Sequence, residues 1–221
     1  FETGPLLGLE GGTVYTDLQL ISGDDGSSDF GVLQAVSNID ADHRFQLSRL
    51  WYEQRIDSWG TAVRLGKMDA NTQFAYVDSG AGFLHSSMGF SPTILGMPTY
   101  PDPAFGLVVK QRLAPGVRIG AGVYDGAAQE GVPTGSRGPS TLFGDPSDLF
   151  GIGELEFAWE GGRAAVGGWL HTGRFERFGA ARVHHKVDAR LGQSLGTAAP
   201  QPLRRRTYNG PFARNTQIHT D

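Results

Sequence analysis

Charged and aromatic side chains recur at every second residue in several short stretches, and together they could contact a polar solute. Arginine and lysine donate hydrogen bonds, glutamate accepts them, and tyrosine or tryptophan offers a flat ring face. Alternatively, such residues only solvate the wall of a water-filled space, because opposite charges on neighbouring strands attract each other. The candidates given by the alternation are Arg64, Lys110, Arg112, Arg118, Tyr124, Glu154, Glu156, Arg163, Trp169 and His171.

The elements that must position these residues are β-strands, because successive side chains of a strand point to opposite faces. In VRIGAGVYDG, for example, Val117, Ile119 and Val123 share one face, whereas Arg118 and Tyr124 share the other. The same period of two predicts seven strands, over residues 12–22, 44–56, 61–70, 105–114, 117–126, 151–160 and 163–173.

The connections between the predicted strands alternate between short and long. The short ones are tight turns at residues 57–60, 115–116 and 161–162. The long ones are residues 23–43, 71–104 and 127–150. Loops of more than about 15 residues are uncommon in compact soluble domains, whereas outer-membrane barrels have short periplasmic turns and long outer loops. The pattern therefore favours an all-β, antiparallel, up-and-down transmembrane β-barrel, although a soluble antiparallel domain would show the same alternation.

One predicted strand breaks the alternation. In RFQLSRLWYEQRI (44–56), the apolar side chains change faces between Leu47 and Leu50. A single extra residue in a strand reverses its alternation. We therefore expect a β-bulge near Ser48–Arg49.

Composition sets further bounds on the class of protein. The chain has 221 residues, 33 glycines and no cysteine, so disulfides and thiolate metal sites are excluded. No stretch approaches the roughly 20 apolar residues of a membrane-spanning helix. The sequence opens at Phe1 without the charged and apolar regions of a signal peptide. We expect either that a signal was removed or that the chain starts within a longer gene.

Five stretches carry a more specific signal, namely VSNIDADHRFQLSRLWYEQ (36–54), LGKMDANTQFAYVDSGAGFLHSSMGFSPTI (65–94), PTYPDPAFG (98–106), GAGVYDG (120–126) and GGWLHTGRF (167–175). In this order they resemble the OprB-type carbohydrate-selective porins of Gram-negative outer membranes. The resemblance covers about residues 9–175. It implies an outer-membrane channel for passive diffusion of small sugars, surrounded by lipid, with no cofactor and no nucleic-acid partner, and it leaves self-association into a homo-oligomer open.

The C-terminal part departs from this family. Residues 1–177 hold 12 Lys/Arg and 21 Asp/Glu, a net charge of −9, whereas residues 178–221 hold 7 and 2, a net charge of +5. The family would continue here with further strands, but the sequence loses its alternation. We therefore expect residues 1–177 to form about seven strands of a larger porin barrel. Residues 178–221 are expected to be a basic, irregular tail that is disordered or read out of frame.

The stretch PTYPDPAFG holds three prolines at Pro98, Pro101 and Pro103. Proline fixes φ and lowers the entropy that a loop loses on ordering. In a porin, the long loop over residues 83–106 could fold inward and line or narrow the channel. A loop that only caps the outer rim is the alternative.

Other motifs provide little support for catalysis or metal binding. Ser87 lies in HSSMG, half of a nucleophile elbow, but His85 stands where its first glycine should be. NIDAD (38–42) begins like a calcium loop without its later glycine. We predict no catalytic residue and no metal site. The alternative function is a soluble β-sheet domain that binds or hydrolyses carbohydrate, with Glu154 and Glu156 as its paired carboxylates.

Overall fold

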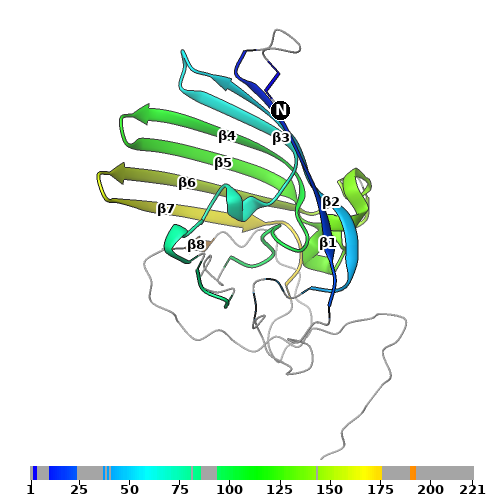
Figure 1. Cartoon of the computed structure of the whole chain (residues 1–221). Helices are drawn as coiled ribbons and strands as arrows, with labels where there is room; N and C mark the ends of the chain where they lie inside the picture. The colour runs from blue at the N-terminus through cyan, green and yellow to red at the C-terminus, as the bar shows by residue number, and fades with distance from the viewer. Residues whose placement is uncertain are drawn as a thin grey trace, which may run out of the picture.

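The structure is a computed structural model that describes residues 2–3, 10–23, 37, 39, 41–80, 82–85, 94–142, 144–175 and 190–192. Its strands form one sheet in which every strand pairs antiparallel with its neighbours in sequence, as Figure 1 shows. The strands are β1 (Gly12–Ile21), β2 (Arg44–Ile56), β3 (Thr61–Met68), β4 (Ala104–Ala114), β5 (Val117–Asp125), β6 (Leu149–Trp159), β7 (Gly162–His171) and β8 (Arg190–Gly192).

The first seven strands match the seven predicted ranges to within two residues at each end. The antiparallel, up-and-down order predicted from the alternation is confirmed. The short strand β8 pairs with the outer end of β7 and was not predicted, because its three residues are too few to show an alternation. It lies in the segment 178–221, and the proposed boundary near residue 177 stays a prediction.

Strand β2 contains the expected β-bulge. Asp17 of β1 pairs with Arg49, and the next residue, Leu18, pairs with Leu47, so Ser48 is the extra residue. The bulge restores one apolar face, because Leu47 and Leu50 now lie on the same side of the sheet.

Short turns join the strands at one end of the sheet and long connections join them at the other (Figure 1). The turns at residues 115–116 and 160–161 end on Gly116 and Gly161, whose φ values of +74° and +84° suit glycine. The helices of the long connections are η1 (Ala70–Thr72), η2 (Asp78–Gly80), η4 (Ala127–Glu130), α3 (Thr134–Arg137) and η5 (Gly138–Thr141). Among the described residues, no helix has the length and apolar character needed to cross a membrane.

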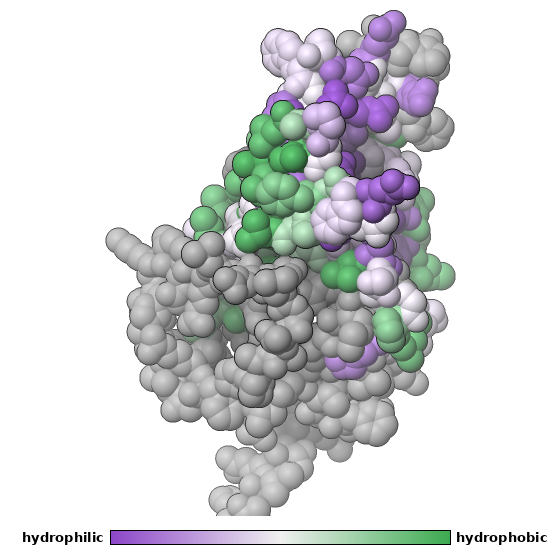
Figure 2. Space-filling view, turned by 90° about the vertical axis from the view of Figure 1, so that its left-hand side faces the viewer, coloured by the Kyte–Doolittle hydropathy of each residue, from purple (hydrophilic) through white to green (hydrophobic). Residues whose placement is uncertain are grey.

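One face of the sheet is apolar and open. Leu65, Leu107 and Val123 are paired directly across β3, β4 and β5, and they are 62%, 46% and 51% exposed. Ile119 and Phe157 continue the same face. Figure 2 shows a group of hydrophobic residues on the coloured part of the surface, beside hydrophilic ones. Exposed leucines in register across several strands are expected where a sheet faces lipid.

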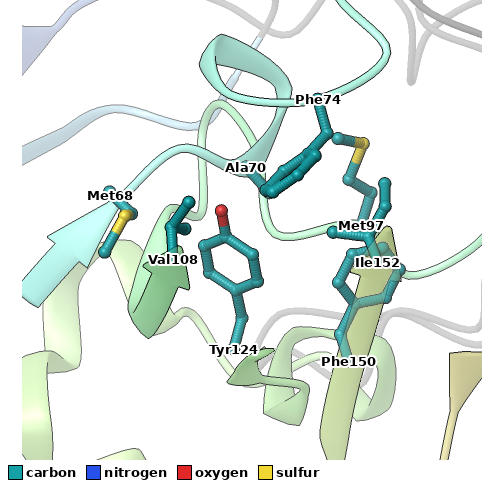
Figure 3. Packing of buried hydrophobic residues seen from close by; sticks show 8 residues of the cluster. All are labelled: Met68, Ala70, Phe74, Met97, Val108, Tyr124, Phe150 and Ile152. Carbon is teal, nitrogen blue, oxygen red and sulfur yellow. The ribbon is translucent and has the colours of Figure 1, made fainter. Parts of the chain in front are cut away.

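The hydrophobic cluster lies on the opposite, inner face of the sheet. It is formed by strand residues together with residues of the β3–β4 connection, which lies over them (Figure 3). Phe74 from this connection packs with Tyr124 and Phe150, which are 1% and 0% exposed. The complete cluster is Met68, Ala70, Phe74, Met97, Val108, Tyr124, Phe150 and Ile152.

Candidate pore wall

The strand register brings opposite charges side by side on the inner face. Arg118 of β5 lies directly opposite Glu156 of β6, and its Nη2 is 2.5 Å from Glu156 Oε1. Arg163 of β7 donates from Nη1 to the second carboxylate oxygen, Oε2, over 2.8 Å. Glu156 therefore bridges two guanidinium groups, and the Arg118 side chain is still 58% exposed. This arrangement leaves donor N–H groups of Arg118 facing the interior.

A second charged group lies on β1, β2 and β3. Arg64 and Glu53 are direct neighbours in register, with Nη2 and Oε2 2.6 Å apart. The Arg64 guanidinium also lies 3.9 Å above the ring of Trp51, which stacks on Tyr15 with ring centroids 5.0 Å apart. Both faces of Trp51 are thus covered, so this tryptophan orients Arg64 rather than offering a free ring face.

A segment of the β3–β4 connection, residues 69–80, lies against the inner face, and we call it the inward segment. Side chains from three strands hold its backbone: Lys110 donates to the Gln73 carbonyl (2.9 Å), Glu154 accepts from the Ala75 N–H (2.9 Å), and Arg163 donates to the Tyr76 carbonyl. Arg163 Nε also lies 3.5 Å from Asp78 Oδ2. This part of the connection therefore lines the inner face; the expectation that the following loop lines the wall concerns residues 83–106, of which 86–93 lie outside the described residues, and it stays a prediction.

Phe74 anchors the inward segment in a gap that two glycines leave. A Cβ atom added at Gly122 would lie 2.8 Å from Phe74 Cε2, and one added at Gly120 would lie 3.1 Å from Phe74 Cε1. Any larger residue at Gly122 would therefore displace the ring. These glycines alternate on β5, so together they form a flat site for one aromatic ring.

The base of the same connection is tied together at Asp69. Its Oδ1 accepts from the Asn71 N–H (2.8 Å) and its Oδ2 from the Tyr100 N–H (3.1 Å). Ala70 donates to the carbonyl of Pro98 over 2.8 Å. Burial raises the pKa of the Asp69 carboxyl, and hydrogen bonds from the Thr99 side chain and from the surrounding backbone oppose this rise. The proline-rich stretch thus closes the connection at the point where it leaves and rejoins the sheet.

The ten predicted residues fall into three groups. Those in the charged pairs of the inner wall are Arg64, Arg118 and Glu156; of these Arg118 is exposed, Arg64 is partly buried and Glu156 is buried, whereas Arg112 is exposed beside the 57–60 turn. Those that hold the inward segment are Lys110, Glu154 and Arg163. Those packed in or against the hydrophobic cluster are Tyr124, Trp169 and His171. Tyr124 and His171 are 1% and 2% exposed, so a solute does not reach them.

Several inner-wall residues were absent from the predicted set. Arg49 pairs with Asp17 over 2.7 Å and donates to the Tyr15 hydroxyl over 3.1 Å. Trp51 and Glu53 follow on the same strand. Because the bulge in β2 shifts the alternation along the strand, the sequence pattern alone does not show that these residues share the inner face. Glu53 could have been found by counting outward from the tight turn at 57–60, which sets it opposite Arg64.

The sheet thus separates two environments, with apolar side chains on one face and paired charges on the other. Short turns at one end, long connections at the other and a loop segment against the inner face define the wall of a membrane porin. No cluster of three or more metal-ligating side chains occurs among the described residues.

Comparison with known proteins agrees with this class. The family model for the carbohydrate-selective porins of the OprB family matches residues 1–216. Among solved structures, OprB from Pseudomonas putida at high pH is similar, with a TM-score of 0.61 and 15% sequence identity. The match covers 79% of this chain and 44% of that structure, so the chain spans less than half the length of its structural relative. No match is found among curated proteins.

The chain belongs to the OprB family of carbohydrate-selective porins, which are proteins of the Gram-negative outer membrane. The open sheet is part of a transmembrane barrel of this family, consistent with the expected partial barrel. The family match extends well into residues 178–221.

Proposed function

We propose that this chain forms part of an outer-membrane porin that passes small sugars by passive diffusion. The observation that carries the proposal is the position of the inward segment. It lies against the inner face of the sheet, which carries paired charges, while the outer face of the same sheet is apolar. A water-filled passage narrowed in this way favours uncharged, hydroxylated solutes, because each hydroxyl can donate and accept in turn.

The residues proposed to meet the solute are charged groups of the inner wall that do not hold the inward segment. Arg118 and Arg112 supply donors near the short-turn end, and Arg64 with Glu53 supplies a donor and an acceptor. Because the charges are already paired, each bond to a sugar replaces a bond to water at little net gain. Weak binding of this kind is required for release on the far side.

Lys110, Glu154 and Arg163 have a different proposed role. Their polar atoms are engaged by the inward segment, so they fix the width of the passage instead of binding solute. Tyr124, Trp169 and His171 support the same segment through packing.

The alternative, a soluble sugar-binding or glycoside-hydrolysing domain, has less support. A hydrolase needs two available carboxylates beside its substrate. Glu154 accepts from the Ala75 N–H, and Glu156 is bonded to both Arg118 and Arg163. We therefore propose a channel without enzymatic activity, with lipid as its surroundings and with self-association into a homo-oligomer as a further proposal.

The test is liposome swelling with the porin purified from outer membranes, so that its barrel is complete. We expect rapid influx of neutral pentoses and hexoses and slower influx of anions of similar size. Equal rates for both classes would contradict carbohydrate selectivity. A preparation that stays soluble without detergent would support the alternative.

A further inference from the structure

We propose that a niche beside the β-bulge of β2 holds one sugar ring during its passage. The inference rests on the proposed sugar-porin function and assigns a binding position within it. The niche is a cavity of about 150 Å³, a space for several water molecules or roughly one monosaccharide. Its polar lining is formed by Asp17, Gln19, Ser48, Arg49, Asp69 and Tyr100.

The bulge explains why Ser48 belongs to this lining. Ser48 has no partner in the β1–β2 register, and the bulge turns the chain locally so that its side chain meets the cavity. The residue is 6% exposed, and its hydroxyl makes no hydrogen bond to the described residues. Bulges often redirect a side chain toward a functional site. A hydroxyl that faces a cavity and has no protein partner is available to a bound molecule.

The remaining groups combine donors and acceptors. Asp17 Oδ2 accepts from both Nε and Nη2 of Arg49, at 3.0 and 2.7 Å. This leaves Asp17 Oδ1 as an acceptor and Arg49 Nη1 as a donor for other groups. Gln19 uses its Oε1 to accept from Gln46, so its amide N–H groups are also available.

This lining matches a neutral polyol better than an ion. The charges of Asp17 and Arg49 cancel, and both carboxylate oxygens of Asp69 already accept backbone N–H groups from Asn71 and Tyr100, so an ion gains little net attraction. Adjacent hydroxyls of a sugar each offer one donor and two acceptor lone pairs. They can therefore bond simultaneously to a carboxylate oxygen, a guanidinium N–H and the Ser48 hydroxyl.

The niche also lies toward the long-connection end of the inner wall, where the inward segment begins at Asp69. Strand β2 runs from the long-connection end at Arg44 to the short turn after Ile56. Ser48 and Arg49 are nearer the former, and Glu53 with its partner Arg64 is nearer the latter. A sugar entering from the long-connection side meets the niche first.

The experiment is single-channel recording in planar bilayers with the porin purified from outer membranes, using glucose as the probe. A sugar ring held in the niche interrupts the ion current, so the glucose concentration for half-block measures its occupancy. Ser48→Ala removes one hydrogen bond and should raise this concentration about threefold to tenfold. Ser48→Thr keeps the hydroxyl and should stay close to the wild type.

Two further variants complete the test. Ser48→Met fills the cavity and should abolish the glucose block while ion current persists. Leu18→Val, on the opposite face at the same level, should leave the block unchanged. A wild-type block that survives both Ser48→Ala and Ser48→Met overturns the niche but leaves the porin function intact. A wild type with neither glucose flux nor block overturns the proposed function itself. If Ser48→Met does not assemble, the contrast between the alanine and threonine variants decides.

Discussion

The backbone N–H of Ala75 donates to Glu154 Oε2 over 2.9 Å, although the two residues are 79 positions apart in the chain. This bond joins the inward segment to the far side of the sheet. The Glu154 carboxylate is thereby used to hold the inward segment and is not free to bind a solute. Glu154 of β6 is therefore one of three side chains, with Lys110 and Arg163, that hold the inward segment.

Replacing Glu154 should release the inward segment. In Glu154→Ala the Ala75 N–H loses its partner, which should lower the free energy of unfolding by about 1–3 kcal/mol and increase single-channel conductance. Glu154→Gln keeps a carbonyl acceptor and should change both quantities much less. Conductance and urea unfolding in detergent measure the effect, and equal behaviour of the two variants would contradict it.

Adding a methyl group at Gly122 should displace Phe74. The new Cβ would lie 2.8 Å from rings of both Phe74 and Tyr124, so overpacking should cost about 1–3 kcal/mol of stability. Gly153→Ala is the matched control, because its nearest atom would be 3.7 Å away, an ordinary contact. Thermal unfolding of the two variants makes the comparison; a Gly122→Ala protein as stable as Gly153→Ala would refute the docking of Phe74.

Labelling should separate the two faces of β5. The chain has no cysteine, so single replacements can be read without background. In membranes, a water-soluble thiol reagent should modify Arg118→Cys faster than Ile119→Cys, because Arg118 faces the charged interior and Ile119 the apolar exterior. The reverse order would invert the inside and outside assignment.

Asp69 should make stability depend on pH in a defined direction. Burial raises the pKa of its carboxyl above the ordinary value of 3.8, so the folded state binds the proton more tightly than the unfolded state. The contribution of this group to stability is therefore complete below pH 3.8 and is lost as the pH rises through the folded-state pKa. The difference between wild type and Asp69→Asn, measured by urea unfolding from pH 3 to 7, should change across this range. Parallel curves would show that Asp69 titrates normally.

Much of the sheet could be predicted because its two faces meet different solvents. An apolar exterior and a charged interior impose a period of two on each strand, and tight turns such as residues 57–60 then fix the register. Even the bulge at Ser48 followed from this logic, since an extra residue was the simplest way to return Leu47 and Leu50 to one face.

The sequence could not predict which inner-face residues stay exposed and which hold or pack beneath the inward segment. Alternation assigns Lys110 and Tyr124 to the same face as Arg118 but does not say which of them a loop covers. That depends on Phe74 meeting Gly122, a contact between residues 48 positions apart in the chain that leaves no local signal. Asp17 and Arg49 were missed because their pairing requires the register beyond the bulge.

The anchoring of the inward segment also implies an order of events during biogenesis. Its contacts come from Lys110 on β4, Gly122 on β5, Glu154 on β6 and Arg163 on β7, so four consecutive strands must already be joined. Until Arg163 is in place, nothing in β7 can hold Tyr76 and Asp78. The inward segment can therefore take up all of its contacts only after these four strands have joined, so its docked position reports a correctly formed sheet.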